Sequence, residues 1–248
     1  MSFRVVIPAR FDSSRLPGKA LMALAGKPML QWVHERARAS AASEVVVATD
    51  DERIAVAARG FGADVAMTAR THVSGTDRIA EVAAARGWGE GDIVVNVQGD
   101  EPLIPPRVID QVADLLAPNV RADIATLAAK IETQNDLADP NNVKVACDVA
   151  GRALYFSRAP IPFNRDAPTT LSAACLRHVG IYAYRVSALR KLSSLPASRL
   201  ELIEKLEQLR ALENGMEIRV ALAVERPLAD VNTAADLERA ERALLLRP

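Results

Sequence analysis

The chain has 248 residues, half of them hydrophobic, so it is long enough for one large domain with a buried core. It carries 31 Lys plus Arg against 31 Asp plus Glu. This balance excludes an overall basic field of the kind that attracts nucleic acid or an anionic membrane, so any cationic function must be local.

The two cysteines, Cys147 and Cys175, are far apart and lie in apolar contexts. We expect two free thiols in a reducing compartment, because their spacing fits neither a disulfide framework nor a zinc site. No apolar run approaches the roughly 20 residues that a membrane span requires. The sequence therefore predicts a cytoplasmic protein with no membrane insertion and no nucleic-acid partner.

In the first half of the chain, short β-branched runs alternate with helical patterns. Three continuous apolar runs are typical of strands in a parallel sheet covered on both faces, namely residues 5–7, 45–48 and 93–97. Apolar residues recur at helical spacing within residues 30–37, 54–58, 79–83 and 108–116. This alternation predicts an α/β fold with a doubly wound, mostly parallel sheet.

In the second half, strand-like runs follow one another without the regular alternation with helices. Strands are predicted at residues 124–128, 143–147, 154–156, 179–184 and 218–224. A strong amphipathic helix is predicted over residues 198–213, with Ile203, Leu206, Leu209 and Leu212 on one face and Asn214-Gly215 as its stop signal. No flexible linker divides the chain. We therefore expect a single domain over residues 1–248, whose halves, 1–117 and 118–248, share one sheet.

Polar segments follow three of the predicted strands, at the sheet edge where α/β proteins bind ligands. Residues 8–19 supply Arg10, Arg15 and Lys19, residues 49–50 follow the second strand, and residues 98–102 supply Asp100 and Glu101. Cations facing a carboxylate suit a polyphosphate held together with Mg²⁺. A solvated surface loop is the alternative. Pro17-Gly18 favours the site, because this pair fixes the chain direction before Lys19.

Several of these residues have simpler structural interpretations. Asp100 could end a turn, Thr49-Asp50-Asp51 could cap the next helix, and Ser74-Gly75 could form a turn instead of offering amides to a ligand. The first loop is not a P-loop, because Ala20 follows Lys19 where that motif has Ser or Thr. Arg158 and Arg165 flank a proline-rich loop. If both reached one cleft, they would suit a carboxylate ligand.

The chain resembles the 3-deoxy-manno-octulosonate (Kdo) cytidylyltransferases, or CMP-Kdo synthetases, of lipopolysaccharide synthesis. The resemblance runs essentially end to end, through residues 7–10, 14–19, 47–50, 72–78, 95–102, 153–158, 176–182 and 204–210. The first motif is shared with relatives that activate sialic acid. The segments Tyr-Phe-Ser-Arg, Arg-His-x-Gly-Ile-Tyr and Glu-Gln-Leu-Arg are more specific to the Kdo enzymes.

This resemblance implies a magnesium-dependent reaction in which Kdo attacks the α-phosphorus of CTP to give CMP-Kdo and pyrophosphate. It implies a fold of the nucleotide-diphospho-sugar transferase type with a smaller inserted dimerisation region, and a homodimer. The first half would bind the nucleotide, and the second half would bind the sugar and form the dimer. Arg10, Lys19 and Asp100 would be catalytic. The implied nucleotide-binding residues are Pro8, Ala9, Arg10, Ser13, Ser14, Lys19, Ser74, Gly75, Arg78 and Gln98. The implied sugar-binding residues are Gln98, Arg158, Arg165, His178, Tyr182 and Glu207.

The implied metal ligands are Asp100, Asn232 and Asp230, and here the sequence departs from the family. The family usually reads Gly-Val-Asp-Thr where this chain has Asp230-Val231-Asn232-Thr233. Side chains two apart on an extended segment face the same side, so Asp230 could restore the missing charge. Asn232-Thr233 could also simply cap the final helix, expected over residues 234–245. The alternatives in function are a CTP-dependent enzyme for sialic acid or 8-amino-Kdo, a sugar-1-phosphate nucleotidyltransferase, and a non-catalytic CTP-binding protein.

Overall fold

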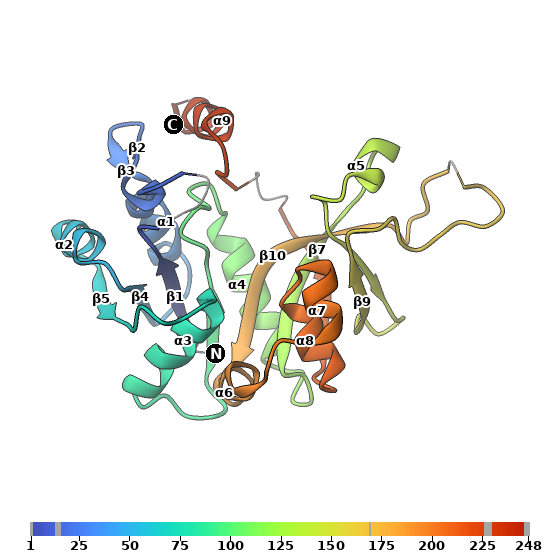
Figure 1. Cartoon of the computed structure of the whole chain (residues 1–248), viewed down its shortest axis with the longest axis horizontal. Helices are drawn as coiled ribbons and strands as arrows, with labels where there is room; N and C mark the ends of the chain where they lie inside the picture. The colour runs from blue at the N-terminus through green and yellow to red at the C-terminus, as the bar shows by residue number, and fades with distance from the viewer. Residues whose placement is uncertain (1, 13–15, 169, 226–229, 246–248) are drawn as a thin grey trace.

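A computed structural model describes residues 2–12, 16–168, 170–225 and 230–245 of the chain. Its main sheet has the strand order β11-β7-β10-β6-β1-β4-β5 (Figure 1). These strands are β1 (Arg4–Ala9), β4 (Glu44–Thr49), β5 (Asp64–Met67), β6 (Ile93–Asn96), β7 (Ile124–Lys130), β10 (Leu176–Arg185) and β11 (Ile218–Leu222). A separate two-stranded hairpin consists of β2 (Ala23–Leu24) and β3 (Lys27–Pro28).

The two halves of the chain meet inside this sheet. Strands β6, β1, β4 and β5 are parallel, whereas β10 runs antiparallel to both β6 and β7. The outer end of β10 also pairs with β8 (Lys144–Cys147), which pairs in turn with β9 (Ala153–Ser157). This part forms a smaller unit at the end of the molecule furthest from β5, and residues 158–168 and 170–175 extend from it (Figure 1).

Helices cover both faces of the sheet. The helices are α1 (Met29–Arg38), α2 (Glu52–Gly60), α3 (Gly75–Ala85), α4 (Pro106–Leu116), α5 (Gln134–Ala138), α6 (Val186–Ser194), α7 (Arg199–Glu204), α8 (Gln208–Glu213) and α9 (Ala234–Leu245), with a short 3₁₀ turn, η1 (Lys19–Leu21). Helices α1, α2 and α4 pack on one face with Val5 and Ile7, and α3, α6 and α8 pack on the other with Val6. Successive residues of β1 therefore face opposite layers, as expected of a buried parallel strand.

The predicted doubly wound α/β fold is confirmed, and every predicted strand is present. The final helix, Ala234–Leu245, has the predicted bounds. Several elements were not predicted, namely the short η1, β2, β3 and α5 together with β5 and α6. Strand β5 is a short edge strand whose Met67 is 46% exposed, and helix α6 follows β10 with no Gly or Pro at the junction.

The continuous helix predicted over residues 198–213 is wrong. The chain leaves helix α7 at Lys205, whose backbone is left-handed (φ 55°, ψ 46°), and begins helix α8 at Gln208. Leu206 and Leu209 are buried as expected, but Ile203 is 76% exposed. The four apolar residues therefore do not share one buried face.

Two sequence-based expectations about composition can be compared with the structure. Cys147 and Cys175 are free thiols, as predicted. Within the described residues, none of the helices combines the length and apolar character needed to cross a membrane.

Candidate functional site

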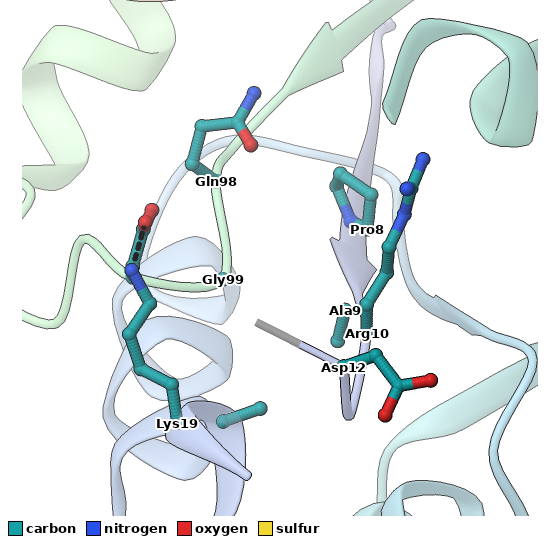
Figure 2. Close-up of a pocket in the computed structure, with 9 residues that line it drawn as sticks. Pro8, Ala9, Arg10, Asp12, Lys19, Gln98 and Gly99 are labelled. Carbon is teal, nitrogen blue, oxygen red and sulfur yellow. Dashed lines mark hydrogen bonds and ion pairs between the residues drawn. The ribbon is translucent and has the colours of Figure 1, made fainter. Parts of the chain in front are cut away.

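A crevice of about 300 Å³ opens where β1 and β6 end, at the sheet edge that the sequence predicts (Figure 2). It is lined by Pro8, Ala9, Arg10, Asp12, Lys19, Ala20, Gln98, Gly99 and Asp100. Lys19 and Arg10 lie on opposite sides of the opening, with Gln98 and Gly99 between them (Figure 2). The convergence of the first loop and the β6 loop on one cavity is thus confirmed.

The backbone of the first loop is held in place just before Lys19. Gly18 has φ 69° and its N–H donates to the Phe11 carbonyl (2.9 Å), which closes the loop. A side chain at residue 18 would meet the Phe11 ring at 3.2 Å, so glycine is required twice over, by the positive φ and by this close approach. The Arg53 guanidinium covers the Phe11 ring at 3.3 Å. Lys19 therefore starts from a fixed turn.

The Lys19 ammonium is bound by two oxygens inside the crevice. Its Nζ lies 2.6 Å from Asp100 Oδ2 and donates to the Val231 carbonyl at 2.7 Å. The Val231 N–H donates in turn to the Asp100 carbonyl (3.0 Å), which fixes the segment before α9 against the β6 loop. The Lys19 and Asp100 side chains are 15% and 25% exposed, and their bond is charge-assisted. Together with Val231, they bring the first, middle and last parts of the chain to one point.

Two further carboxyl groups, those of Glu101 and Asp230, interact with the charge of Asp100. Burial and the neighbouring charges of Asp230 and Asp100 raise the pKa of Glu101 well above its usual value, and Glu101 Oε2 is buried with no partner among the described residues. Burial and the charge of Asp100 likewise raise the pKa of Asp230 to about 6. Burial and mutual repulsion therefore favour the protonated forms of Glu101 and Asp230, and a cation bound beside them would favour the ionised forms instead.

These oxygens fit Mg²⁺, which prefers hard oxygen ligands and commonly takes one or two carboxylates together with substrate phosphates. Within the described residues, no group of three or more His, Cys, Asp or Glu side chains could hold a metal ion by itself. A metal at Asp100 and Asp230 would thus need ligands from a bound phosphate or from water.

A second cavity, of about 120 Å³, shares Gln98 with the crevice. It is lined by Gly75, Thr76, Asn96, Gln98, Ile124, Tyr182, Tyr184, Leu192, Glu207 and Gln208. Asn96 Oδ1 and Glu207 Oε1 are buried without partners among the described residues. Burial raises the pKa of Glu207. Two unpaired acceptors in a small cavity suit a ligand that carries hydroxyl donors.

A third and larger cavity, of about 680 Å³, contains His178, Asp230 and Asn232 together with Glu101. His178 Nε2 is 2.9 Å from Thr126 Oγ1, and its ring packs edge-on against Phe156. Burial and the charge of Arg177 lower the pKa of His178 to about 3, so the ring is neutral. Asp230 and Asn232 thus face the same cavity, as the two-residue spacing predicts.

The structure places several predicted site residues elsewhere. Arg78 is fully buried, and its Nη2 lies 2.9 Å from Asp50 Oδ2, so it joins α3 to the end of β4 instead of lining the crevice. Arg158 donates from Nε to the Glu204 carbonyl (2.7 Å) and from Nη1 to the Pro140 carbonyl (2.9 Å). Arg165 is exposed on the loop 158–175. None of these three lines the crevice or the second cavity, because protein carbonyls and carboxylates or solvent already surround them.

Three serines, Ser13, Ser14 and Ser74, were predicted to bind the nucleotide. Ser74 is the N-cap of α3: its Oγ accepts from the Asp77 N–H (3.1 Å), and Asp77 Oδ2 accepts from the Ser74 N–H. Ser74 thus caps a helix, and Gly75, the first residue of α3, lines the second cavity. Ser13 and Ser14 lie outside the described residues. Asp51 caps α2, as anticipated.

The sequence reasoning missed other lining residues. Asn96 interrupts an otherwise apolar strand, which is a readable signal for a polar group facing a cavity. Asp12, Ala20, Thr76, Tyr184 and Gln208 also line the two smaller cavities. Ala20 and Thr76 adjoin predicted residues. Asp12, Tyr184 and Gln208 carry no comparable local pattern.

Comparison with known proteins assigns the class. The cytidylyltransferase family model matches residues 4–218, and the chain belongs to this family. A protein of Tolumonas auensis named 3-deoxy-manno-octulosonate cytidylyltransferase is 55% identical, over 98% of this chain and 97% of its own length. A protein of Thioalkalivibrio sulfidiphilus with the same name is 52% identical, over 98% of this chain and 99% of its own.

Solved structures agree with this assignment. The structure of a CMP:2-keto-3-deoxy-manno-octonic acid synthetase complexed with CTP has a TM-score of 0.91 and 42% identity, covering 100% of this chain and 99% of that one. A cytidylyltransferase from Leptospira borgpetersenii has a TM-score of 0.64 at 20% identity, over 98% of this chain and 86% of that one, and so shares the fold.

Proposed function

We propose that this chain transfers the cytidylyl group of CTP to Kdo, giving CMP-Kdo and pyrophosphate for lipopolysaccharide synthesis. The Kdo anomeric oxygen forms a bond to the α-phosphorus, the bond from that phosphorus to the pyrophosphate oxygen breaks, and the hydroxyl proton is lost. The observation that carries the proposal is the pairing of Lys19 with Asp100 in a crevice that shares Gln98 with a second, hydroxyl-accepting cavity. The names of the relatives support the choice of both substrates.

The roles follow from where the side chains lie. Arg10 and Lys19 lie on opposite sides of the crevice and would hold the triphosphate, with Pro8 and Ala9 as its wall (Figure 2). Gln98 lies at the junction of the two cavities, where the α-phosphorus and the sugar must meet. Tyr182 and Glu207 would receive the sugar hydroxyls, and His178 lies nearby, with its ring 5.2 Å from that of Tyr182. Positioning and charge neutralisation would supply most of the rate.

We include Mg²⁺ in this proposal as the cofactor, held by Asp100 and Asp230. When bound, it would offset phosphate charge and orient the triphosphate. The repulsion among the Asp100, Glu101 and Asp230 carboxyls, which a cation would relieve, supports its inclusion. Asp230 is the better candidate for the second ligand, because its carboxyl can carry a negative charge and interacts electrostatically with Asp100, whereas the Asn232 side chain is a neutral amide.

A homodimer and a cytoplasmic location also belong to the proposal. Exposed apolar side chains on the smaller unit and on α7, namely Leu154, Phe163, Leu202 and Ile203, support an interface between two copies. The two free thiols are consistent with a reducing compartment. Sedimentation of the purified chain at the mass of one chain would contradict the dimer.

The proposal is tested by measuring pyrophosphate release from CTP and Mg²⁺ with Kdo, 8-amino-Kdo and sialic acid in parallel. We expect the highest kcat/KM with Kdo. Turnover of sialic acid but not Kdo would show that the substrate is a different acidic sugar. Binding of CTP with no turnover of any of the three sugars would overturn the assignment as an enzyme of this class.

A further inference from the structure

The break between helices α7 and α8 lies directly beside the second cavity. Lys205 ends α7 in the left-handed conformation, and its N–H donates to the Glu201 carbonyl at 2.7 Å. Two residues later, Glu207 is the N-cap of α8 and lines the cavity. A left-handed residue at a helix end is commonly glycine, so a lysine there carries a conformational cost.

A straight helix would place Glu207 elsewhere. If α7 continued past Glu204, residue 207 would lie one turn beyond Ile203 on the same face, because residues four apart on a helix are neighbours. Ile203 is 76% exposed, so that face points to solvent. In the structure Glu207 Oε1 is instead buried and has no partner among the described residues. The turn at Lys205 therefore moves Glu207 from the solvent-facing position of a continuous helix to the buried position observed.

Both sides of the break are anchored independently. On the α7 side, Glu204 Oε1 accepts from Ser157 Oγ (2.7 Å) and Oε2 accepts from the Arg158 N–H (3.0 Å), while Arg158 Nε donates to the Glu204 carbonyl (2.7 Å). On the α8 side, Leu209 is fully buried in the core. Residues 205–207 connect these two anchors and carry Glu207 to the cavity, where Thr76 and Ser74 are hydrogen-bond partners of its carboxyl.

We propose that the left-handed turn at Lys205, anchored through Glu204 to the end of β9, positions Glu207 to accept hydroxyl groups of the acidic sugar. This inference rests on the proposed function, because its kinetic readout is the binding of that sugar. Lys205 acts through its backbone. Its side chain is exposed and forms no ion pair with the described residues.

The test compares variants at residue 205 that differ in tolerance of positive φ. Lys205→Gly accepts the left-handed conformation without strain, whereas Lys205→Val strongly disfavours it. We expect Lys205→Gly to keep the KM for Kdo and the KM for CTP within about twofold of those of the unaltered chain. We expect Lys205→Val to raise the KM for Kdo by about tenfold or more, with little change in the KM for CTP, since misplacement by about 1 Å can cost two orders of magnitude. Lys205→Ala gives a milder form of the same change if the valine variant does not fold.

A matched control is available at Ala25, which also has positive φ (46°) and lies in the turn between β2 and β3, outside both cavities. Ala25→Val introduces the same backbone strain, so we expect a comparable loss of thermal stability with an unchanged KM for Kdo. An equal rise in the KM for Kdo in both valine variants would show a general loss of stability and would overturn the proposal.

The outcomes separate this inference from the proposed function. If the unaltered chain turns over Kdo while Lys205→Val or Lys205→Ala keeps its KM, the positioning role is wrong and the function stands. If the unaltered chain turns over none of the sugars, crystal structures decide the positioning role directly. Displacement of the Glu207 carboxylate in Lys205→Val, but not in Lys205→Gly, supports it, and an unmoved carboxylate in both contradicts it.

Discussion

At the scale of single residues, the ion pair of Lys19 with Asp100 is the central feature of the site. The ammonium lies between a carboxylate oxygen at 2.6 Å and a carbonyl oxygen at 2.7 Å. Triphosphate oxygens would compete for the ammonium, while a metal would compete for the carboxylate. The pair therefore keeps both partners at the same point of the crevice before the nucleotide arrives.

Replacement of Lys19 by Ala removes this ammonium, and we expect kcat/KM for CTP to fall by roughly 10²–10³, the loss typical of one charge-stabilising donor. The measurement is pyrophosphate release at varied CTP concentration, with the fold checked by thermal melting. Lys27→Ala is the control. Lys27 pairs with Glu35 at 2.8 Å outside the crevice, so its loss should leave the rate unchanged. Near-normal turnover in Lys19→Ala would remove the phosphate role.

Asp230 and Asn232 can be distinguished by their effect on the magnesium requirement. The charge of Asp100 acts on the Asp230 carboxyl, whereas the Asn232 side chain is a neutral amide. We expect Asp230→Ala to raise the Mg²⁺ concentration for half-maximal rate by about tenfold or more, and Asn232→Ala to change it little. A magnesium titration of both variants gives the order, and the reverse order would assign the metal to Asn232.

At the scale of elements, strand β10 contains an irregularity that supports the sugar side of the site. Its pairing with β7 shifts between Val179 and Tyr182, and Thr126 of β7 fills the gap. The Thr126 hydroxyl lies 3.1 Å from the Val179 carbonyl and 2.7 Å from the Ile181 carbonyl, within reach of His178 Nε2 at 2.9 Å. The Thr126 hydroxyl thus lies within hydrogen-bonding distance of buried carbonyl groups at the irregularity. The same irregularity brings the rings of His178 and Tyr182 to 5.2 Å from each other.

His178 should make stability sensitive to acid. Its pKa is about 3 in the folded chain against an ordinary value of 6.5, so between these pH values the unfolded chain binds a proton that the folded chain does not. Stability should therefore fall as the pH drops through this window, by at most about 1.4 kcal/mol per pH unit from this group. Urea unfolding at pH 7, 6 and 5 should show a shallower fall in His178→Gln. Identical pH dependence in both chains would contradict the assignment.

The sequence predicted most elements because their signals are local, and it failed where the cause is distant. Continuous apolar runs identify β1, β4 and β6, since strands buried on both faces have no other pattern. Lys205 is a good helix former with no Gly or Pro beside it, so no local signal predicts the break between α7 and α8. Its anchor, the contact of Glu204 with Ser157, joins residues that are 47 positions apart.

The same distinction applies to the site. Lys19, Asp100 and Gln98 could be predicted because each follows a strand whose end meets the others at one edge of the sheet. Arg78 could not be assigned correctly from its motif alone, because its burial and its pairing with Asp50 depend on the packing of α3 against β4. For Arg158 the partner carbonyls belong to α7 and to the turn before β8, which no spacing reveals.

At the scale of the whole molecule, one continuous sheet combines the two halves of the chain. Strand β6 ends at the crevice and pairs with β10, which carries His178 and Tyr182, so a single rigid layer fixes the phosphate side relative to the sugar side. Segments that are far apart in sequence complete the arrangement, since the Val231 carbonyl lies 212 positions from Lys19. Such a site requires the entire domain to be folded.

The most direct measurement is a crystal structure of the chain with CTP and Mg²⁺. We expect phosphate oxygens within hydrogen-bonding distance of Lys19 Nζ and the metal bound to the Asp100 carboxylate. The ion pair between these two side chains should then be broken. Phosphates bound in another cavity, with the ammonium still resting on Asp100, would contradict it.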